Sequence, residues 1–180
     1  MNFDTKHLIR WGIPGWVYLM TIIFYVFSDN PHYISDLKGK EGLSLIGLGA
    51  ILAGLGVPVG YLIHQVSMFF GFIIWTPNKN KFFKEEYELD RIIFDSEDKG
   101  RKIRERYRHL LSRIHELRAL KTSHILSIIT VASLALFYSE TVNKPSIIIL
   151  IVNIIMVIIV HFNQSHFEKN LDFFKKKLKE

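Results

Sequence analysis

Four long apolar stretches decide what this chain can fold into. An α-helix needs about 20 mainly apolar residues to cross about 30 Å of hydrocarbon. Arg10 is the only Asp, Glu, Lys or Arg residue within the four stretches. They therefore predict an all-α integral membrane protein, a helical bundle with four transmembrane helices. The stretches are Leu8–Phe27, Leu43–Trp75, Ser123–Tyr138 and Ser146–Phe162.

The basic residues are divided unequally between the two sides that four spans define. Twenty of the 23 Lys and Arg residues lie in the N-terminal tail, in the segment 76–121 and in the C-terminal tail. The opposite side receives only Lys38, Lys40 and Lys144. Lys and Arg beside membrane segments are retained on the cytoplasmic side. We therefore predict a multi-pass protein of the bacterial cytoplasmic (inner) membrane with both termini in the cytoplasm.

This topology divides the chain into four parts. Residues 1–75 hold the first two transmembrane helices, and residues 76–121 form a charged cytoplasmic helical region. Residues 122–163 hold the third and fourth spans, and residues 164–180 form a basic amphipathic tail. The second apolar stretch exceeds the length of one span, so we expect its membrane part to end near Ile63.

The charged region predicts a helix that continues into the third span. No proline or glycine lies between Gly100 and Tyr138, so we expect one rod about 55–60 Å long. Apolar residues recur in the rod with spacings of 4, 3, 4 and 3, which is typical of a short coiled-coil seam. We expect extensions of spans two and three to form a cytoplasmic helical hairpin. The seam residues are Ile103, Tyr107, Leu110, Ile114 and Leu117.

The C-terminal tail repeats this apolar spacing beside a cluster of lysines. Such a pattern predicts an amphipathic basic helix that lies on an anionic inner leaflet. In the preceding span, nearly all Ile and Val, Asn153 is a candidate for an interhelical hydrogen bond. The apolar residues of the tail are Phe167, Leu171, Phe174 and Leu178, and its lysine cluster is 175–177.

Two spans carry candidate pore or gate residues. In the second span, closely spaced glycines let two helix backbones approach, and Pro58 should bend the helix. This pattern fits a gating helix that lines a pore, and it equally fits a close-packed helix in a bundle. In the third span, a face of hydroxyls can line an aqueous path or pack against a neighbouring helix. The candidates are Gly54, Gly56, Pro58, Gly60, His64, Ser127 and Thr130.

A run of basic residues in the rod is the candidate ligand site. Arginine forks suit phosphate oxygens, so an oligomer that gathers several such faces could hold a nucleotide or oligonucleotide. The alternative is that these side chains provide orientation charge and pair with lipid headgroups and with acids, namely Glu97, Asp98, Glu105 and Glu116. The candidate ligand-binding residues are Arg101, Lys102, Arg104, Arg108 and Arg113.

Several kinds of chemistry lack the residues they need. The chain has no cysteine and no GxxxxGK[ST] loop, and His115-Glu116 is followed by Ala119 where an HExxH motif needs histidine. No carboxylate pair lies within a span, and the ionisable residues that coupled transporters usually carry in mid-membrane are missing. We expect no enzymatic activity, cofactor or metal; a membrane enzyme would need reactive groups to converge near His64, His124 and His161.

The function we predict is a homo-oligomeric membrane channel or pore-forming effector gated through its basic cytoplasmic helices. A small helical membrane part joined to a basic cytoplasmic region resembles, in layout, the membrane-disrupting effectors of bacterial anti-phage systems. That resemblance implies a response to a nucleotide or nucleic-acid signal. The alternative is a non-conducting adaptor or scaffold in the bilayer that recruits a soluble partner through Glu85–Arg118.

Overall fold

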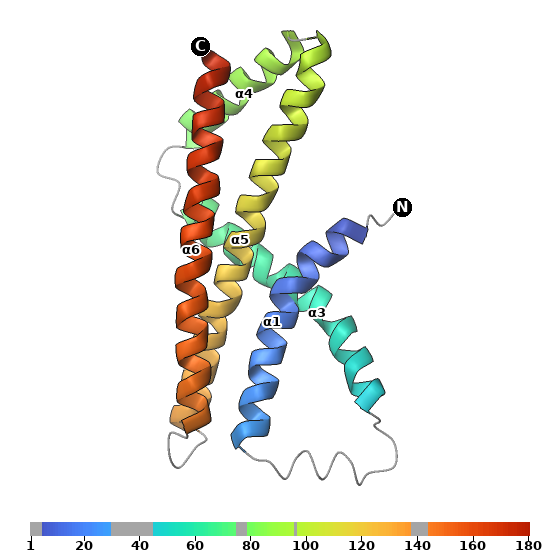
Figure 1. The fold of residues 1–180 in the computed structure, drawn as a ribbon, viewed down its shortest axis with the longest axis vertical. Coiled ribbons are helices and arrows are strands. Elements are labelled where there is room, and N and C mark those ends of the chain that lie inside the picture. Colours follow the sequence, from blue (N-terminus) through green and yellow to red (C-terminus); the bar gives the residue numbers. More distant parts are fainter. Residues whose placement is uncertain (1–4, 30–44, 75–78, 96, 138–143) are drawn as a thin grey trace.

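The computed structural model describes residues 5–29, 45–74, 79–95, 97–137 and 144–180 (Figure 1). These residues form five α-helices and one π-helical segment, with no strand among them, which confirms the predicted all-helical class. The elements in chain order are α1 (Thr5–Asp29), α3 (Leu45–Met68), η1 (Phe69–Ile74), α4 (Lys79–Asp95), α5 (Glu97–Phe137) and α6 (Lys144–Lys179).

Four helices, α1, α3, α5 and α6, are long and apolar enough to cross a membrane. This supports the prediction of a multi-pass membrane protein. The helices α1 and α3 and the adjoining parts of α5 and α6 form one half of the molecule, which we call the apolar half (Figure 1). The helix α4 and the remaining parts of α5 and α6 form the other, which we call the charged half. The C-terminal ends of α1 and α5 and the N-terminal ends of α3 and α6 lie toward the far end of the apolar half, and the C-terminal end of α6 and the N-terminal end of α5 lie toward the far end of the charged half (Figure 1).

The helices α1 and α3 cross with their backbones in contact. A Cβ atom added at Gly15 would overlap the carbonyl oxygen of Gly56, and one added at Gly60 would overlap the carbonyl oxygen of Trp11. Beside this crossing, Trp16 Nε1 donates a hydrogen bond to the carbonyl oxygen of Ala53 at 3.1 Å. Gly56 and Gly60, which form a GxxxG pair in the second span, therefore pack within the chain, against α1.

The helix α5 is a single rod of 41 residues, as predicted, and is about 60 Å long. Its apolar seam is buried: Leu110 and Ile114 form a cluster with Leu171 of α6. Phe167 and Phe174 of α6 pack against this cluster. The apolar face of the C-terminal tail thus contacts α5, where the sequence suggested a membrane surface, because two stripes of the same spacing can bury each other.

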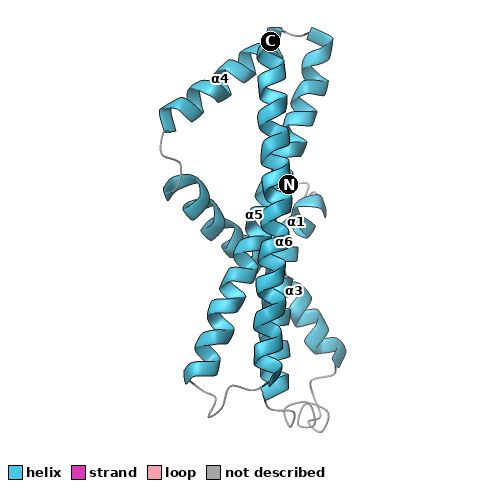
Figure 2. Cartoon of the chain, turned by 60° about the vertical axis from the view of Figure 1, so that its left-hand side comes forward, coloured by secondary structure: helices cyan, strands magenta, loops and turns pink. Residues whose placement is uncertain are grey.

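The apolar seam of α5 packs against α6, the helix that carries the fourth apolar stretch, and α4 is a separate helix that contacts this pair (Figure 2). The cytoplasmic hairpin of extensions of spans two and three stays a prediction. Leu89 and Ile93 of α4 are buried. Gly100 admits the Ile93 carbonyl to the first turns of α5, where a Cβ would overlap it. Beside Leu89, in the middle of α4, a hydrogen bond from Lys179 lowers the pKa of Glu88.

The α1–α3 crossing gives a test with a matched control. Gly15→Ala and Gly60→Ala place a methyl group against backbone that cannot rotate away, and we expect each to cost about 1–3 kcal/mol. Gly49→Ala and Gly54→Ala enter open space. They should change stability by less than about 1 kcal/mol, since alanine favours the helix. Thermal unfolding of the detergent-solubilised protein measures both pairs, and equal effects would contradict this packing.

Candidate functional site

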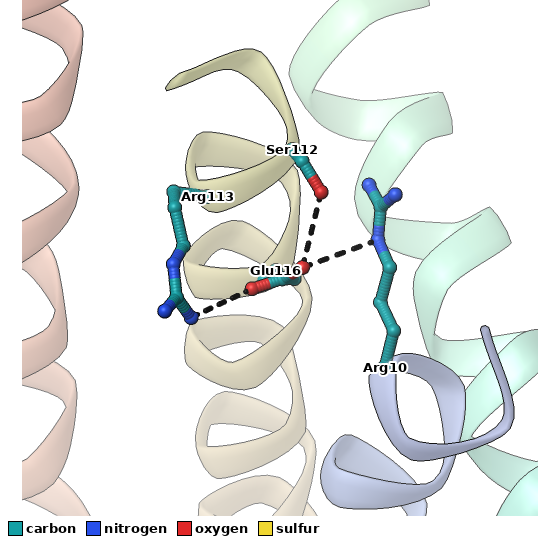
Figure 3. A network of polar contacts seen from close by, with 4 residues as sticks. All are labelled: Arg10, Ser112, Arg113 and Glu116. Carbon is teal, nitrogen blue, oxygen red and sulfur yellow. Dashed lines mark hydrogen bonds and ion pairs between the residues drawn. The ribbon is translucent and has the colours of Figure 1, made fainter. Parts of the chain in front are cut away.

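Polar side chains gather where the apolar half meets the charged half, around Glu116 of α5 (Figure 3). The Glu116 carboxylate accepts hydrogen bonds from the Ser112 hydroxyl and from Arg113, both at 3.1 Å. On its other side lies Arg10 of α1, whose Nε atom is 3.7 Å away. Two guanidinium groups therefore share one carboxylate, and the group carries one uncompensated positive charge.

The same stretch of α5 contacts the remaining helices. The rings of His115 and His64 of α3 meet edge to face, with centroids 6.4 Å apart. Arg118 lies 3.5 Å from Glu168 of α6, and its side chain lies against Gly71 of η1. We call residues 112–118 of α5 the junction, because a shift of this segment would move its contacts with α1, α3, η1 and α6 together.

A cavity of about 480 Å³ opens beside the junction, between α3, α4, α5 and α6. In its wall, the Tyr107 hydroxyl donates a hydrogen bond to Glu86 at 2.7 Å, and Lys175 lies 5.8 Å from the centre of the Phe82 ring. Three acids and two basic residues line the cavity, so its charge does not suit a polyanion. These charged residues are Glu86, Glu168, Asp172, Arg118 and Lys175.

A second group of polar side chains, which we call the polar seam, runs through the apolar half between α1, α5 and α6. Ser123 donates a hydrogen bond to the Pro14 carbonyl oxygen at 2.6 Å, and the hydroxyls of Tyr18 and Thr130 lie 3.0 Å apart. His124 Nδ1 lies 2.8 Å from Asn153 Oδ1, which confirms the interhelical hydrogen bond predicted for that asparagine.

Some atoms of this polar seam have no hydrogen-bond partner among the described residues. They are His124 Nε2, the Ser127 hydroxyl and the Tyr25 hydroxyl, all buried. Asn153 Nδ2 donates to the Ile149 carbonyl oxygen, so its Oδ1 atom faces His124 as an acceptor. His124 Nδ1 then carries the proton, and its Nε2 atom is left as a buried acceptor. Buried polar atoms of this kind are sites that water can occupy.

The predicted pore or gate residues lie on four different surfaces. Gly56 and Gly60 belong to the α1–α3 crossing, whereas Gly54 and Pro58 lie on the exposed face of α3. His64 is at the junction beside His115. Ser127 and Thr130 belong to the polar seam inside one chain.

The predicted ligand-binding residues fall into two places. Arg104 lies over the ring of Phe94 of α4, with its Cζ atom 5.7 Å from the ring centre. Arg113 stands apart, bound to Glu116 at the junction. The four predicted ligand-binding residues on the charged half of α5 are all exposed, namely Arg101, Lys102, Arg104 and Arg108.

The junction as a unit was not predicted from the sequence. Arg10 and Glu116 are far apart in the chain, and their sequence positions give no sign that they meet. One signal was present: the seam of the rod and the tail share the 4, 3, 4 spacing. Pairing the two segments would have placed Glu168 of α6 opposite α5, near Arg118.

No protein-family model matches this chain, and no curated protein or solved structure shows significant similarity to it.

The bond between His124 and Asn153 can be tested by a double-mutant cycle. Hydrogen bonds between membrane helices contribute about 0.6 kcal/mol on average and up to about 1.7 kcal/mol. We expect the upper part of this range, because removing one partner leaves the other buried. The cycle uses His124→Phe, Asn153→Leu and the double variant, followed by thermal unfolding in detergent. A coupling energy of zero would show that the two side chains do not interact.

Proposed function

We propose that this chain is a homo-oligomeric membrane channel or pore-forming effector whose path forms between copies and whose cytoplasmic helices control it. In this proposal the apolar half lies in the bacterial inner membrane, and α4 with the outer parts of α5 and α6 lies in the cytoplasm, as do both termini. The charge distribution supports this orientation, since twenty of the 23 basic residues then lie on the inner side.

The observation that carries the proposal is an open polar stripe on α3. An α-helix pairs the carbonyl of Gly54 with the amide of residue 58, but Pro58 has no amide hydrogen to donate. Both residues are exposed, and no side chain lies within 4 Å of a Cβ added at Gly54. A backbone carbonyl that faces hydrocarbon without a donor is costly, whereas one that lines an aqueous path binds water or ions.

The stripe continues along the helix at helical spacing. Ala50, Gly54, Pro58, Tyr61 and Gln65 follow one another at intervals of three or four residues, and all are exposed. The side chains of the stripe are therefore small toward the N-terminal end of α3, and they are polar toward the junction. Copies of α3 arranged around an axis would bring these stripes together, with the lipid-facing isoleucines of α6 on the outside.

The rod α5 supplies the coupling between ligand and path. It carries the exposed Arg101, Arg104 and Arg108 at one end and the polar seam at the other. In an oligomer these basic faces would form the site for an anionic ligand, a nucleotide or oligonucleotide in the proposal. Because the junction joins α5 to α3 through His115 and His64, a displacement of the rod reaches the stripe directly.

One observation favours the alternative of a non-conducting adaptor. The helix α4 exposes three aromatic side chains outside the four candidate spans: Phe83, Tyr87 and Phe94. Their spacing places them on one face of the helix, and Tyr87 and Phe94 are 73% and 76% exposed. Such a face suits a soluble partner protein.

Ion flux separates the two functions. We expect Gly54→Leu to abolish ion release from proteoliposomes and depolarisation of producing cells, because the side chain covers the carbonyl and narrows the path. The matched control is Gly49→Leu, which enters equally open space about 140° around the helix. If the Gly54→Leu variant still conducts, the stripe does not line the path. A natural chain that conducts in neither assay would favour the adaptor.

A further inference from the structure

We propose that the groove over α5, between α1 and α6, binds one anionic phospholipid of the cytoplasmic leaflet. The inference rests on the membrane placement proposed above and is independent of conduction. The groove has a volume of about 570 Å³ and is distinct from the cavity beside Tyr107, with which it shares no lining residue.

The polarity of the groove changes along its length as a phospholipid's does. Arg10, Arg113 and Glu116 line it toward the charged half, and Leu117 and Leu120 continue it along α5 toward the apolar half. Across from these leucines lie Ile13 of α1, which is 43% exposed, and Phe167 of α6. A phosphate would lie at the charged end, and the upper part of an acyl chain along the apolar end.

The charges at this end favour a lipid with one net negative charge. Two arginines and one glutamate leave one positive charge, which a single phosphodiester would neutralise. A zwitterionic headgroup brings no net charge and would leave the positive charge of the groove uncompensated.

Both arginines can turn toward a phosphate. Arg10 approaches Glu116 only at 3.7 Å, and its buried Nε atom makes no hydrogen bond within the described residues. The Arg113 side chain is 54% exposed, so it can turn without losing buried contacts. Guanidinium forks bind phosphate oxygens in a two-point geometry that a lysine cannot reproduce.

The test is native mass spectrometry of the full chain, exchanged into neutral detergent and supplied with equal amounts of phosphatidylglycerol and phosphatidylcholine. We expect one retained phosphatidylglycerol per chain and a preference of about tenfold, which corresponds to about 1.4 kcal/mol. The double variant Arg10→Gln/Arg113→Gln should lower the preference to about one. The control Arg91→Gln/Arg106→Gln removes the same charge from exposed positions outside the groove and should keep it.

A second variant tests the groove without changing charge. Leu120→Trp fills the apolar end and should lower retention of phosphatidylglycerol at least fivefold, while soluble glycerophosphoglycerol, the headgroup alone, should bind weakly to every variant. Unfolding temperatures measured without lipid identify variants that fail to fold, and lipid retention is then read from the others.

Three results would overturn the proposal. They are equal retention of the two lipids by the natural chain, loss of preference in the Arg91/Arg106 control, and headgroup binding as strong as lipid binding. The second would indicate general attraction to basic surface, and the third a site for soluble phosphates. A chain that fails to conduct but keeps this preference would overturn the proposed channel and leave the lipid site in place.

Discussion

The contact between the backbones of α1 and α3 is the constraint on which the rest of the apolar half depends. Gly15, Gly56 and Gly60 remove side chains from the crossing, so the two helices approach more closely than larger residues permit. This contact fixes the rotation of α3 about its axis and thereby turns Gly54 and Pro58 away from α1. It also holds the Pro14 turn of α1 in place, where its carbonyl accepts the bond from Ser123 of α5.

The rod α5 is one continuous helix that connects the apolar half to the charged half. Along a single helix it packs against α4 at Gly100 and against α6 at Leu110, contacts α1, α3 and α6 at the junction, and contacts α1 and α6 again in the polar seam. In the proposed channel, a rigid element with contacts at three levels would transmit displacement, because close-packed contacts have few intermediate arrangements. The ion pairs at the junction are partly exposed and individually weak, so they can exchange partners at low cost.

Much of the fold could be predicted from the sequence. The apolar stretches predicted the helices, the absence of glycine and proline between Gly100 and Tyr138 predicted the rod, and the isolated polarity of Asn153 predicted its interhelical bond. Tertiary pairing could not be predicted in the same way. The seam at Leu110 was recognised, but any apolar stripe can satisfy such a seam, and its partner proved to be Leu171 of α6.

The candidate site shows the same limit. Small residues marked α3 as a packing helix, yet the sequence does not say which face is used, and the structure divides them between the crossing and the open stripe. The exposed arginines of α5 remain a predicted ligand site that needs several copies to complete it. The Arg10–Glu116 pair joins residues far apart in the chain, and no local pattern encodes it.

The most direct test of this account is the water accessibility of the stripe in a bilayer. The chain has no cysteine, so Gly54→Cys introduces a single thiol at the proposed path, and Ile155→Cys introduces one on the exposed face of α6. A membrane-impermeant methanethiosulfonate should modify Cys at position 54 and block ion flux, and it should leave position 155 unmodified. If both positions resist the reagent while the protein conducts, the path lies elsewhere and the open face of α3 does not line it.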